Sequence, residues 1–321
     1  MNTAFSRLLR GALLCALGAA GPAAFGQGSP SGYHFRDVNV RNQANNVLTL
    51  MTFTVVPDVT TSTLSINAAS SGNPALTMFT LGGGATVSRE LPVYLEGVLG
   101  FSRYDPRYVV SDGTATQTLP VRWNSLSLSG GIGWDFHLTD ELSLRPIVNI
   151  ALGQVVSDLR VGEYILNRIL DREIHFINNG ALTAYGYGAS LMLDWERVRP
   201  EYELDVETRY SNITLQTFSN TDDSVKGRAT AESLNLWTRY RAPTGLTAMQ
   251  KPVRYVLEGA HTQFFGEQQN ALGFDHLTSL GVGVELDSSA HEVFVSRIRL
   301  VARRMYGQNV TGSSIGLALS F

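Results

Sequence analysis

Cysteine is nearly absent from this chain of 321 residues. The single one, Cys15, lies in an apolar N-terminal run, and Leu14 occupies the preceding position, where a lipoprotein signal requires a small residue. A disulfide framework and a lipid anchor on Cys15 are therefore both excluded. Histidine is scarce as well, with six residues that show no metal-ligand spacing, so the sequence predicts no metal site and no cofactor.

Long apolar runs are also missing. Beyond the N-terminal region, no segment reaches the roughly 18 apolar residues that a membrane-spanning helix needs, so the sequence predicts no transmembrane helix. Lysine is represented only by Lys226 and Lys251, and arginine carries the other positive charges. The net charge of −3 gives no indication of nucleic-acid binding.

The first 26 residues have the features of a secretory signal peptide. Arg7 and Arg10 precede an apolar run over residues 11–20, and small residues occupy the positions that signal peptidase reads before Gln27. Cleavage there would remove two arginines and no acid, which leaves 23 basic residues against 28 acidic ones. We therefore expect an exported protein.

From residue 59 onward, apolar residues alternate with polar or small ones at the period of a β-strand. Twelve expected strands lie near residues 59–67, 79–87, 93–102, 125–136, 142–153, 185–195, 201–210, 233–241, 253–258, 279–287, 294–303 and 311–321. Their apolar faces carry aliphatic residues in the middle and aromatic residues at the ends, which is typical of a lipid-facing belt. A soluble sandwich would also alternate, but it would seldom place four acids on one strand face, as residues 201–207 do.

The lengths of the connections support the same fold. Short connections near 88–92, 137–141 and 196–200 fall on one side of the expected sheet, and longer ones such as 103–120 and 155–180 fall on the other. The spacing within 155–180 is compatible with a short helix. The sequence thus predicts an all-β, antiparallel transmembrane β-barrel of about 12 strands.

The predicted domain order is a signal peptide over 1–26, a pre-barrel segment over 27–58, and the barrel over 59–321. Two interpretations of the stretch Val47–Val56 stay open. It forms either an extra strand or a segment inside the lumen, and an extra strand would change the even strand number that the connections favour.

The C-terminal residues resemble the assembly signal of bacterial outer-membrane β-barrels. Ser314, Gly316, Leu319 and Phe321 fit its pattern of a polar residue, a glycine and two spaced hydrophobic residues, the last of them aromatic. The resemblance implies location in the outer membrane of a Gram-negative bacterium. The expected partners are outer-membrane lipid, the barrel assembly machinery and periplasmic chaperones.

Two internal segments carry a family resemblance. VYLEGVLGFSRYDP at 93–106 and LSLRPIVNIALG at 142–153, with the strand number and the terminal Phe321, resemble the solitary autotransporter-like β-barrels of Gram-negative bacteria. The likeness covers most of residues 59–321. The chain departs from the plan of an autotransporter with a large passenger, because fewer than forty residues separate the expected cleavage site from the first expected strand.

Closing twelve strands into a barrel gathers their polar faces around one lumen. We expect a luminal charge network made of Glu96, Asp135, Arg145, Glu203, Asp205, Glu207, Arg209, Arg239, Arg254, Glu258, Arg297, Arg299 and Arg303. It either fills the lumen with ion pairs, which we favour, or sets up an electric field across a water-filled pore.

Signals for catalysis are poor. His261, Ser211 and Asn212 lie at similar expected heights, but three such residues can be picked by chance, and the sequence predicts that the chain is not an enzyme. The leading functional hypothesis is an integral outer-membrane barrel with a structural or surface-interaction role. The alternatives are a small diffusion channel with a charged lumen and, third, an outer-membrane hydrolase.

Overall fold

The computed structural model describes residues 40–57, 63–66, 75–105, 107–111, 116–120, 122–157, 181–218, 227–269, 271–287, 297–308 and 310–320. All of them belong to one unit, residues 36–321. The predicted signal peptide, most of the connection 155–180 with its possible helix, and Phe321 lie outside the described residues. The predicted domain boundaries stay predictions.

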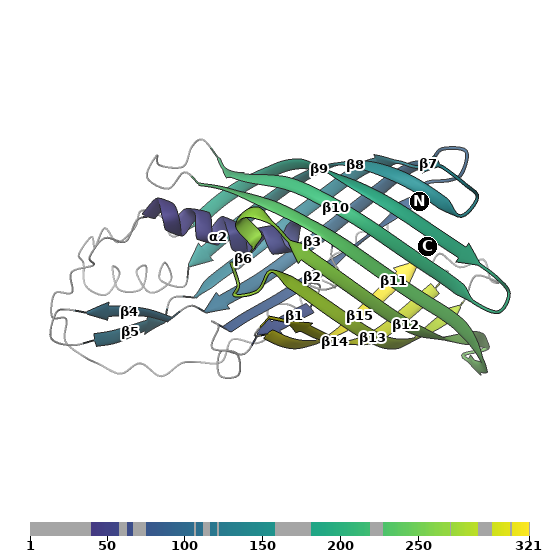
Figure 1. Ribbon diagram of the computed structural model, residues 1–321. Coiled ribbons are helices and arrows are strands. Elements are labelled where there is room, and N and C mark those ends of the chain that lie inside the picture. Colours follow the sequence, from purple (N-terminus) through teal and green to yellow (C-terminus); the bar gives the residue numbers. More distant parts are fainter. Residues whose placement is uncertain are drawn as a thin grey trace, which may run out of the picture. The chain divides into compact units, whose positions relative to one another are not determined.

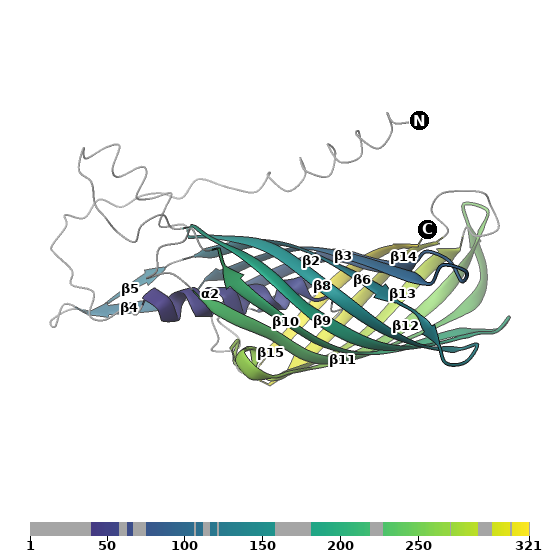
Figure 2. The same cartoon turned by 90° about the horizontal axis from the view of Figure 1, so that it is seen from above.

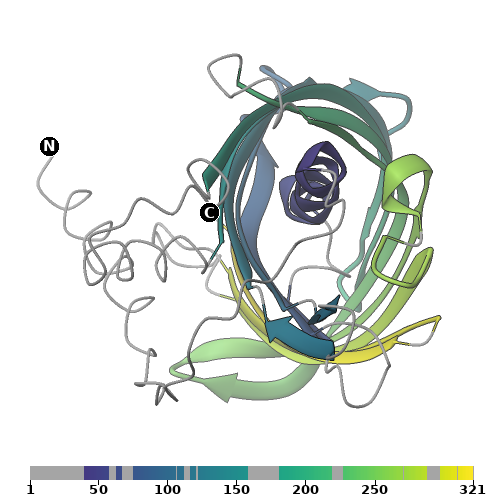
Figure 3. The same cartoon turned by 90° about the vertical axis from the view of Figure 1, so that its left-hand side faces the viewer.

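Twelve strands follow one another in chain order around a single antiparallel sheet, so the predicted fold class and strand number are confirmed (Figure 1). They are β1 (Thr63–Ile66), β2 (Ala75–Thr86), β3 (Val93–Asp105), β6 (Trp123–Trp134), β8 (Leu142–Ser157), β9 (Ala181–Val198), β10 (Glu203–Thr217), β11 (Arg228–Ala248), β12 (Lys251–Phe264), β13 (His276–Asp287), β14 (Arg297–Gly307) and β15 (Val310–Ser320). The two-residue strand β7 (Phe136–His137) pairs with the start of β8. The sheet curls until β15 lies against β1, and Figure 3 looks along the resulting ring.

The outer face of the ring is an apolar belt. Large side chains on it stay exposed on strand after strand, among them Leu81, Leu99, Leu128, Ile132, Val148, Ile150, Leu191, Leu236, Leu257, Leu280, Val282 and Leu300. Exposure reaches 67% at Val148 and Ile150, far more than a water-soluble protein leaves on so many neighbouring side chains. An apolar exterior around a polar interior is the pattern of a barrel that has lipid as its outer solvent.

Residues 47–56 form a helix, and the alternative of an extra strand is wrong. Helix α2 (Val40–Val55) precedes the barrel, and Figure 3 shows it inside the ring. Apolar residues spaced three and four apart, Leu48, Met51 and Val55, give it one packing face, and Pro57 follows its end. Among the described residues, no helix is long and apolar enough to cross a membrane.

Two features of the connections were not predicted. The expected loop 103–120 contains a separate hairpin of β4 (Arg107–Ser111) and β5 (Thr116–Pro120), beyond the end of the barrel that holds α2 (Figures 1 and 2). At the opposite end, β11 and β12 continue through most of the interval between the expected strands 233–241 and 253–258 and turn at Met249 and Gln250, both with positive φ. In this extension, the backbone groups of the two strands continue to hydrogen-bond beyond the part of the sequence in which polar and apolar residues alternate.

Candidate functional site: the barrel lumen

The lumen has two parts with different chemistry. One part, which we call the helix-filled half, is lined by apolar residues that enclose α2. The other, the charged half, holds acids and arginines that point inward from β3, β8, β10 and the strands up to β14. Both parts come from the inward face of the same strands, because side chains alternate faces along a strand and the inward positions change from apolar to charged along it.

The helix-filled half packs α2 on two sides. On one side, Leu48, Met51, Val55 and Val56 join a buried cluster with Ala151, Val155, Leu182, Ala184, Ile213, Leu215, Ala229 and Ala231. On the other side, Leu50 and Phe53 join Leu76, Met78, Phe264, Leu272, Phe274, Leu277, Met305 and Val310. The Phe53 ring lies 5.0 Å from the ring of Phe264 and 6.3 Å from that of Phe274. These contacts bury α2 around its circumference.

Polar contacts and a glycine bring α2 close to the wall. The Thr54 hydroxyl lies 2.9 Å from the Ser127 hydroxyl of β6 and also donates to the carbonyl of Met51 at 2.8 Å. Gly100 on β3 faces the same point, where a Cβ atom would lie 2.6 Å from Thr54 Cβ and 2.5 Å from Ser127 Oγ. The absence of a side chain at Gly100 therefore makes room for the helix.

Arg145 of β8 is surrounded by acceptors in the charged half. It forms an ion pair with Asp135 and another, at 3.2 Å, with Asp194 of β9. The Thr86 hydroxyl donates to the second oxygen of Asp135 at 2.6 Å. The guanidinium also lies 4.0 Å from the centre of the Tyr94 ring. A buried arginine is thus both charge-paired and packed on an aromatic face.

Glu96 and Arg209 form an ion pair across the lumen. They lie on β3 and β10, which have three strands between them in the sheet order. Two hydrogen bonds of 2.6 and 2.8 Å join the guanidinium to both carboxylate oxygens, the bidentate geometry that strengthens such a pair. Both side chains are almost completely buried, and Asn149 donates a further bond of 2.6 Å to Glu96.

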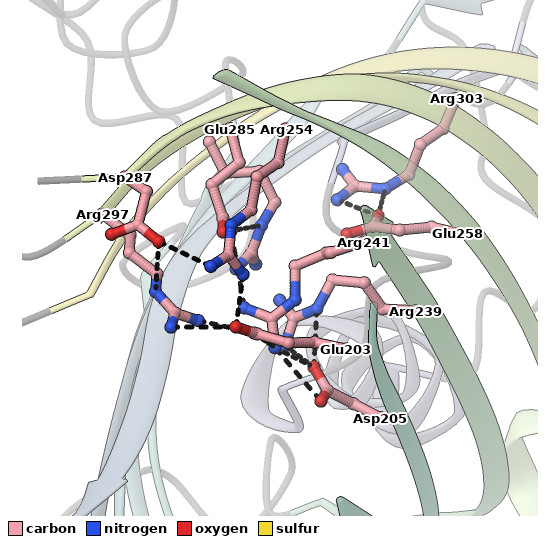
Figure 4. A network of polar contacts seen from close by, with 11 residues as sticks. Glu203, Asp205, Arg239, Arg241, Arg254, Glu258, Glu285, Asp287, Arg297 and Arg303 are labelled. Carbon is pink, nitrogen blue, oxygen red and sulfur yellow. Dashed lines mark hydrogen bonds and ion pairs between the residues drawn. The ribbon is translucent and has the colours of Figure 1, made fainter. Parts of the chain in front are cut away.

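A larger group of ion pairs is centred on Glu203 of β10 (Figure 4). Its carboxylate pairs with Arg241, Arg254 and Arg297, which lie on β11, β12 and β14. The remaining pairs of the same region are Arg239 with Asp205, Arg241 with Asp205 and with Glu285, Arg254 with Asp287, Arg297 with Asp287, Arg299 with Glu285, and Arg303 with Glu258. Acids and arginines thus meet within one enclosed space.

The structure brings the predicted charges together with one exception. All thirteen lie in the barrel, and in the described part of the chain each of them except Glu207 takes part in an ion pair. Glu207 lies on β10 between Asp205 and Arg209, on the same inward face. No group of three or more potential metal ligands occurs among the described residues.

From the sequence, a luminal segment over residues 47–56 is one of two open alternatives, but the apolar lining that encloses α2 was not predicted. Its signal is present at the strand ends, where the inward positions Leu76, Met78, Ile213 and Leu215 are apolar although outward neighbours such as Thr77, Asn212 and Gln216 are polar. A barrel filled with water would have polar residues at the inward positions, so apolar residues there indicate that something apolar occupies that part of the lumen.

The remaining predicted residues have separate locations. Ser314 is buried, Gly316 lies against the guanidinium of Arg303, and Leu319 pairs with Ile298 in the ladder between β14 and β15. The three residues considered for hydrolysis do not meet, because Ser211 is buried in the lumen whereas His261 is exposed on the outer face. There the imidazole of His261 lies 2.8 Å from the Thr278 hydroxyl.

No protein-family model and no curated protein matches the sequence. Solved structures that are similar include the β domain of the Bordetella autotransporter BrkA, at 15% identity and a TM-score of 0.43, with 81% of this chain and 96% of that chain covered. The translocator domain of the autotransporter NalP from Neisseria meningitidis matches at 13% identity and a TM-score of 0.38, covering 77% and 82%. LpxR from Salmonella typhimurium matches at 12% identity and a TM-score of 0.39, covering 79% and 90%.

Autotransporter domains are thus among the similar structures, in agreement with the predicted resemblance, and the chain has the general architecture of outer-membrane β-barrels. The prediction that the chain is not an enzyme is wrong. LpxR, an outer-membrane enzyme, is among the similar structures, so this architecture together with a lack of catalytic motifs does not exclude an activity.

Proposed function

We propose that this chain is an integral outer-membrane β-barrel of a Gram-negative bacterium whose lumen is closed by its own helix and ion pairs. It is similar in plan to a solitary autotransporter translocator domain, and it has a structural or surface-interaction role. The observation that carries the proposal is the burial of α2 inside the barrel. The hairpin β4–β5, at the same end as α2, would offer contacts to partners outside the membrane (Figure 1).

The energy of burial supports a closed lumen. Six apolar side chains of α2, namely Leu48, Leu50, Met51, Phe53, Val55 and Val56, are at most 9% exposed. Returning each of them to water costs roughly 1.5–3 kcal/mol, so expelling α2 would cost on the order of 10 kcal/mol as an upper estimate. A helix held this firmly is a plug and not a gate that opens by thermal motion.

Export and assembly belong to the same proposal. The signal peptide over 1–26 would direct the chain across the inner membrane and be cleaved there. Periplasmic chaperones and the barrel assembly machinery would then act on the C-terminal pattern of Ser314, Gly316, Leu319 and Phe321. Outer-membrane lipid would contact the apolar belt.

A small diffusion channel is the second candidate, and the charged half of the lumen favours it. The acidic and basic side chains of the charged half could select ions if α2 left the barrel. The two candidates differ in what α2 does, since a channel requires that the helix move and a closed barrel requires that it stay. Conductance measurements with α2 held or released therefore distinguish them.

A disulfide can hold α2 in place, because the hydroxyls of Thr54 and Ser127 are 2.9 Å apart and Cys15, in the predicted signal peptide, is the only natural cysteine. In planar bilayers, we expect no discrete openings from the Thr54→Cys/Ser127→Cys variant, oxidised or reduced, and clear openings after deletion of residues 36–57. Openings that require reduction would support the channel. Openings from the oxidised variant would contradict a plugged lumen.

A further inference from the structure

An exposed arginine lies on the apolar outer face of the barrel. Arg304 of β14 is exposed there, whereas its chain neighbour Arg303 faces the lumen and pairs with Glu258. Arg304 donates a hydrogen bond of 2.8 Å to the hydroxyl of Ser313 on β15, and no carboxylate of the described residues lies within ion-pair distance of it. A guanidinium among apolar side chains needs water or an anion to satisfy its charge.

The position of Arg304 along β14 is close to the rim. On the same outward face, Tyr306 lies one step nearer the end of the strand, and Ala302 and Leu300 lie on the other side of Arg304. Tyrosine at the end of a barrel strand is typical of the interface between lipid chains and headgroups. Arg304 is therefore at the depth where a lipid headgroup meets its acyl chains.

An apolar groove of about 740 Å³ runs inward from Arg304 along β13, β14 and β15, which are neighbours in the sheet (Figure 1). The side chain of Ala302 is too short to fill the surface between its register partners Val282 and Ile315, which are 63% and 69% exposed. A small residue between two large ones leaves a groove on the outer surface of the barrel wall. Its lining is mostly apolar, and its polar residues are Arg303, Arg304, Ser313 and Ser314, of which Arg304 and Ser313 are exposed on the outer face.

We propose that β13, β14 and β15 form a binding site for an anionic, phosphate-bearing lipid of the surrounding membrane. One acyl chain lies in the groove over Ala302, and the phosphate accepts hydrogen bonds from the Arg304 guanidinium and the Ser313 hydroxyl. Phosphate matches this pair because guanidinium donors bind its oxygens in a fixed, two-pronged geometry. The proposal rests on the membrane placement proposed above.

A tryptophan at the groove can report which lipid occupies it. Leu280 is 60% exposed and is the register partner of Arg304, so Leu280→Trp places an indole at the head of the groove. Leu128→Trp on β6, at a position that is 57% exposed, is the matched control on another part of the belt. The fluorescence of the four natural tryptophans is measured on the parent protein in the same vesicles and is subtracted from that of each variant.

The variants are refolded into phosphatidylcholine vesicles that contain either brominated phosphatidylglycerol or brominated phosphatidylcholine. We expect the anionic lipid to quench Leu280→Trp with an apparent affinity roughly fivefold higher than the zwitterionic lipid, the preference expected from one cation near a membrane surface. The added change Arg304→Gln should abolish this preference, and Arg304→Lys should keep part of it. Leu128→Trp should show no preference in either background.

Four results would overturn the proposal. One is equal quenching of Leu280→Trp by both lipids while Arg304 is present, and another is a preference that survives Arg304→Gln. Inorganic phosphate, added at constant ionic strength, should not compete, and competition would mean a site for a free anion instead of a lipid. Absence of quenching by either lipid at both reporter positions would instead contradict the membrane placement itself, and the lipid site with it.

Discussion

The ion pair between Glu96 and Arg209 provides the sharpest test of the luminal network. It joins two strands of the wall that have three others between them, with side chains that are only 2% and 4% exposed. Replacing Arg209 by methionine keeps a long side chain but leaves the Glu96 carboxylate buried without its counter-charge. The hydrogen bond from Asn149 would still reach that carboxylate, but an amide does not neutralise it.

We expect Arg209→Met to lower the free energy of unfolding by about 3–5 kcal/mol, the cost of removing one partner from a buried ion pair. The double variant Glu96→Gln/Arg209→Met removes both charges and should lie within about 1.5 kcal/mol of the parent, because a buried pair often contributes little over a neutral replacement. The coupling between the two sites should therefore be at least about 2 kcal/mol.

Urea unfolding of the barrel in lipid vesicles, followed by tryptophan fluorescence, measures these differences provided that the transition is reversible. The two single variants, Arg209→Met and Glu96→Gln, and the double variant are compared with the parent at one pH and one ionic strength. A loss of less than about 1 kcal/mol for Arg209→Met, or a double variant whose loss equals the sum of the single ones, would refute the inference that the two charges compensate each other across the lumen.

Three further predictions concern other parts of the chain. Gly100→Val should displace α2, because a Cβ atom at residue 100 would lie 2.5–2.7 Å from atoms of α2 and of the facing wall. The displaced residues 40–55 should then be sensitive to proteases. Gly97→Val is the control, because a Cβ atom there points outward and its nearest neighbouring atom is 3.9 Å away, so this variant should stay resistant. Deletion of Phe321 should reduce the amount of barrel in the outer membrane, and an unchanged amount would count against its role as an assembly signal. In the turn before β8, the hydrogen bond from Arg197 holds the pKa of Glu141 below its usual value. The small contribution of this contact to stability is therefore present at pH values above the usual carboxyl pKa, and it is lost as the pH falls through the lowered pKa of Glu141. Titration by NMR should show this pKa rising in Arg197→Gln, and an unchanged pKa would exclude the contact.

Much of the barrel was predictable because the information is local. The alternation of residues with period two specifies which side chains face outward, and it did so correctly for the described residues of the expected strands from 79–87 to 294–303. The lengths of the connections placed the short turns at one end. The same alternation put Glu203, Asp205 and Arg209 on the inward face, so these three members of the charge network followed from the pattern alone.

Only the closed sheet decided which of these side chains meet. Glu96 pairs with Arg209, which is 113 residues away in the sequence, and Glu203 pairs with Arg297, which is 94 residues away. The curvature and stagger of the strands bring these side chains together. The helical state of residues 47–56 was likewise undecided by the sequence, since a short apolar run suits a strand or a buried helix. The closed sheet removes the ambiguity, because β15 lies against β1 and leaves no free edge for an extra strand, whereas a helix satisfies its backbone hydrogen bonds within itself.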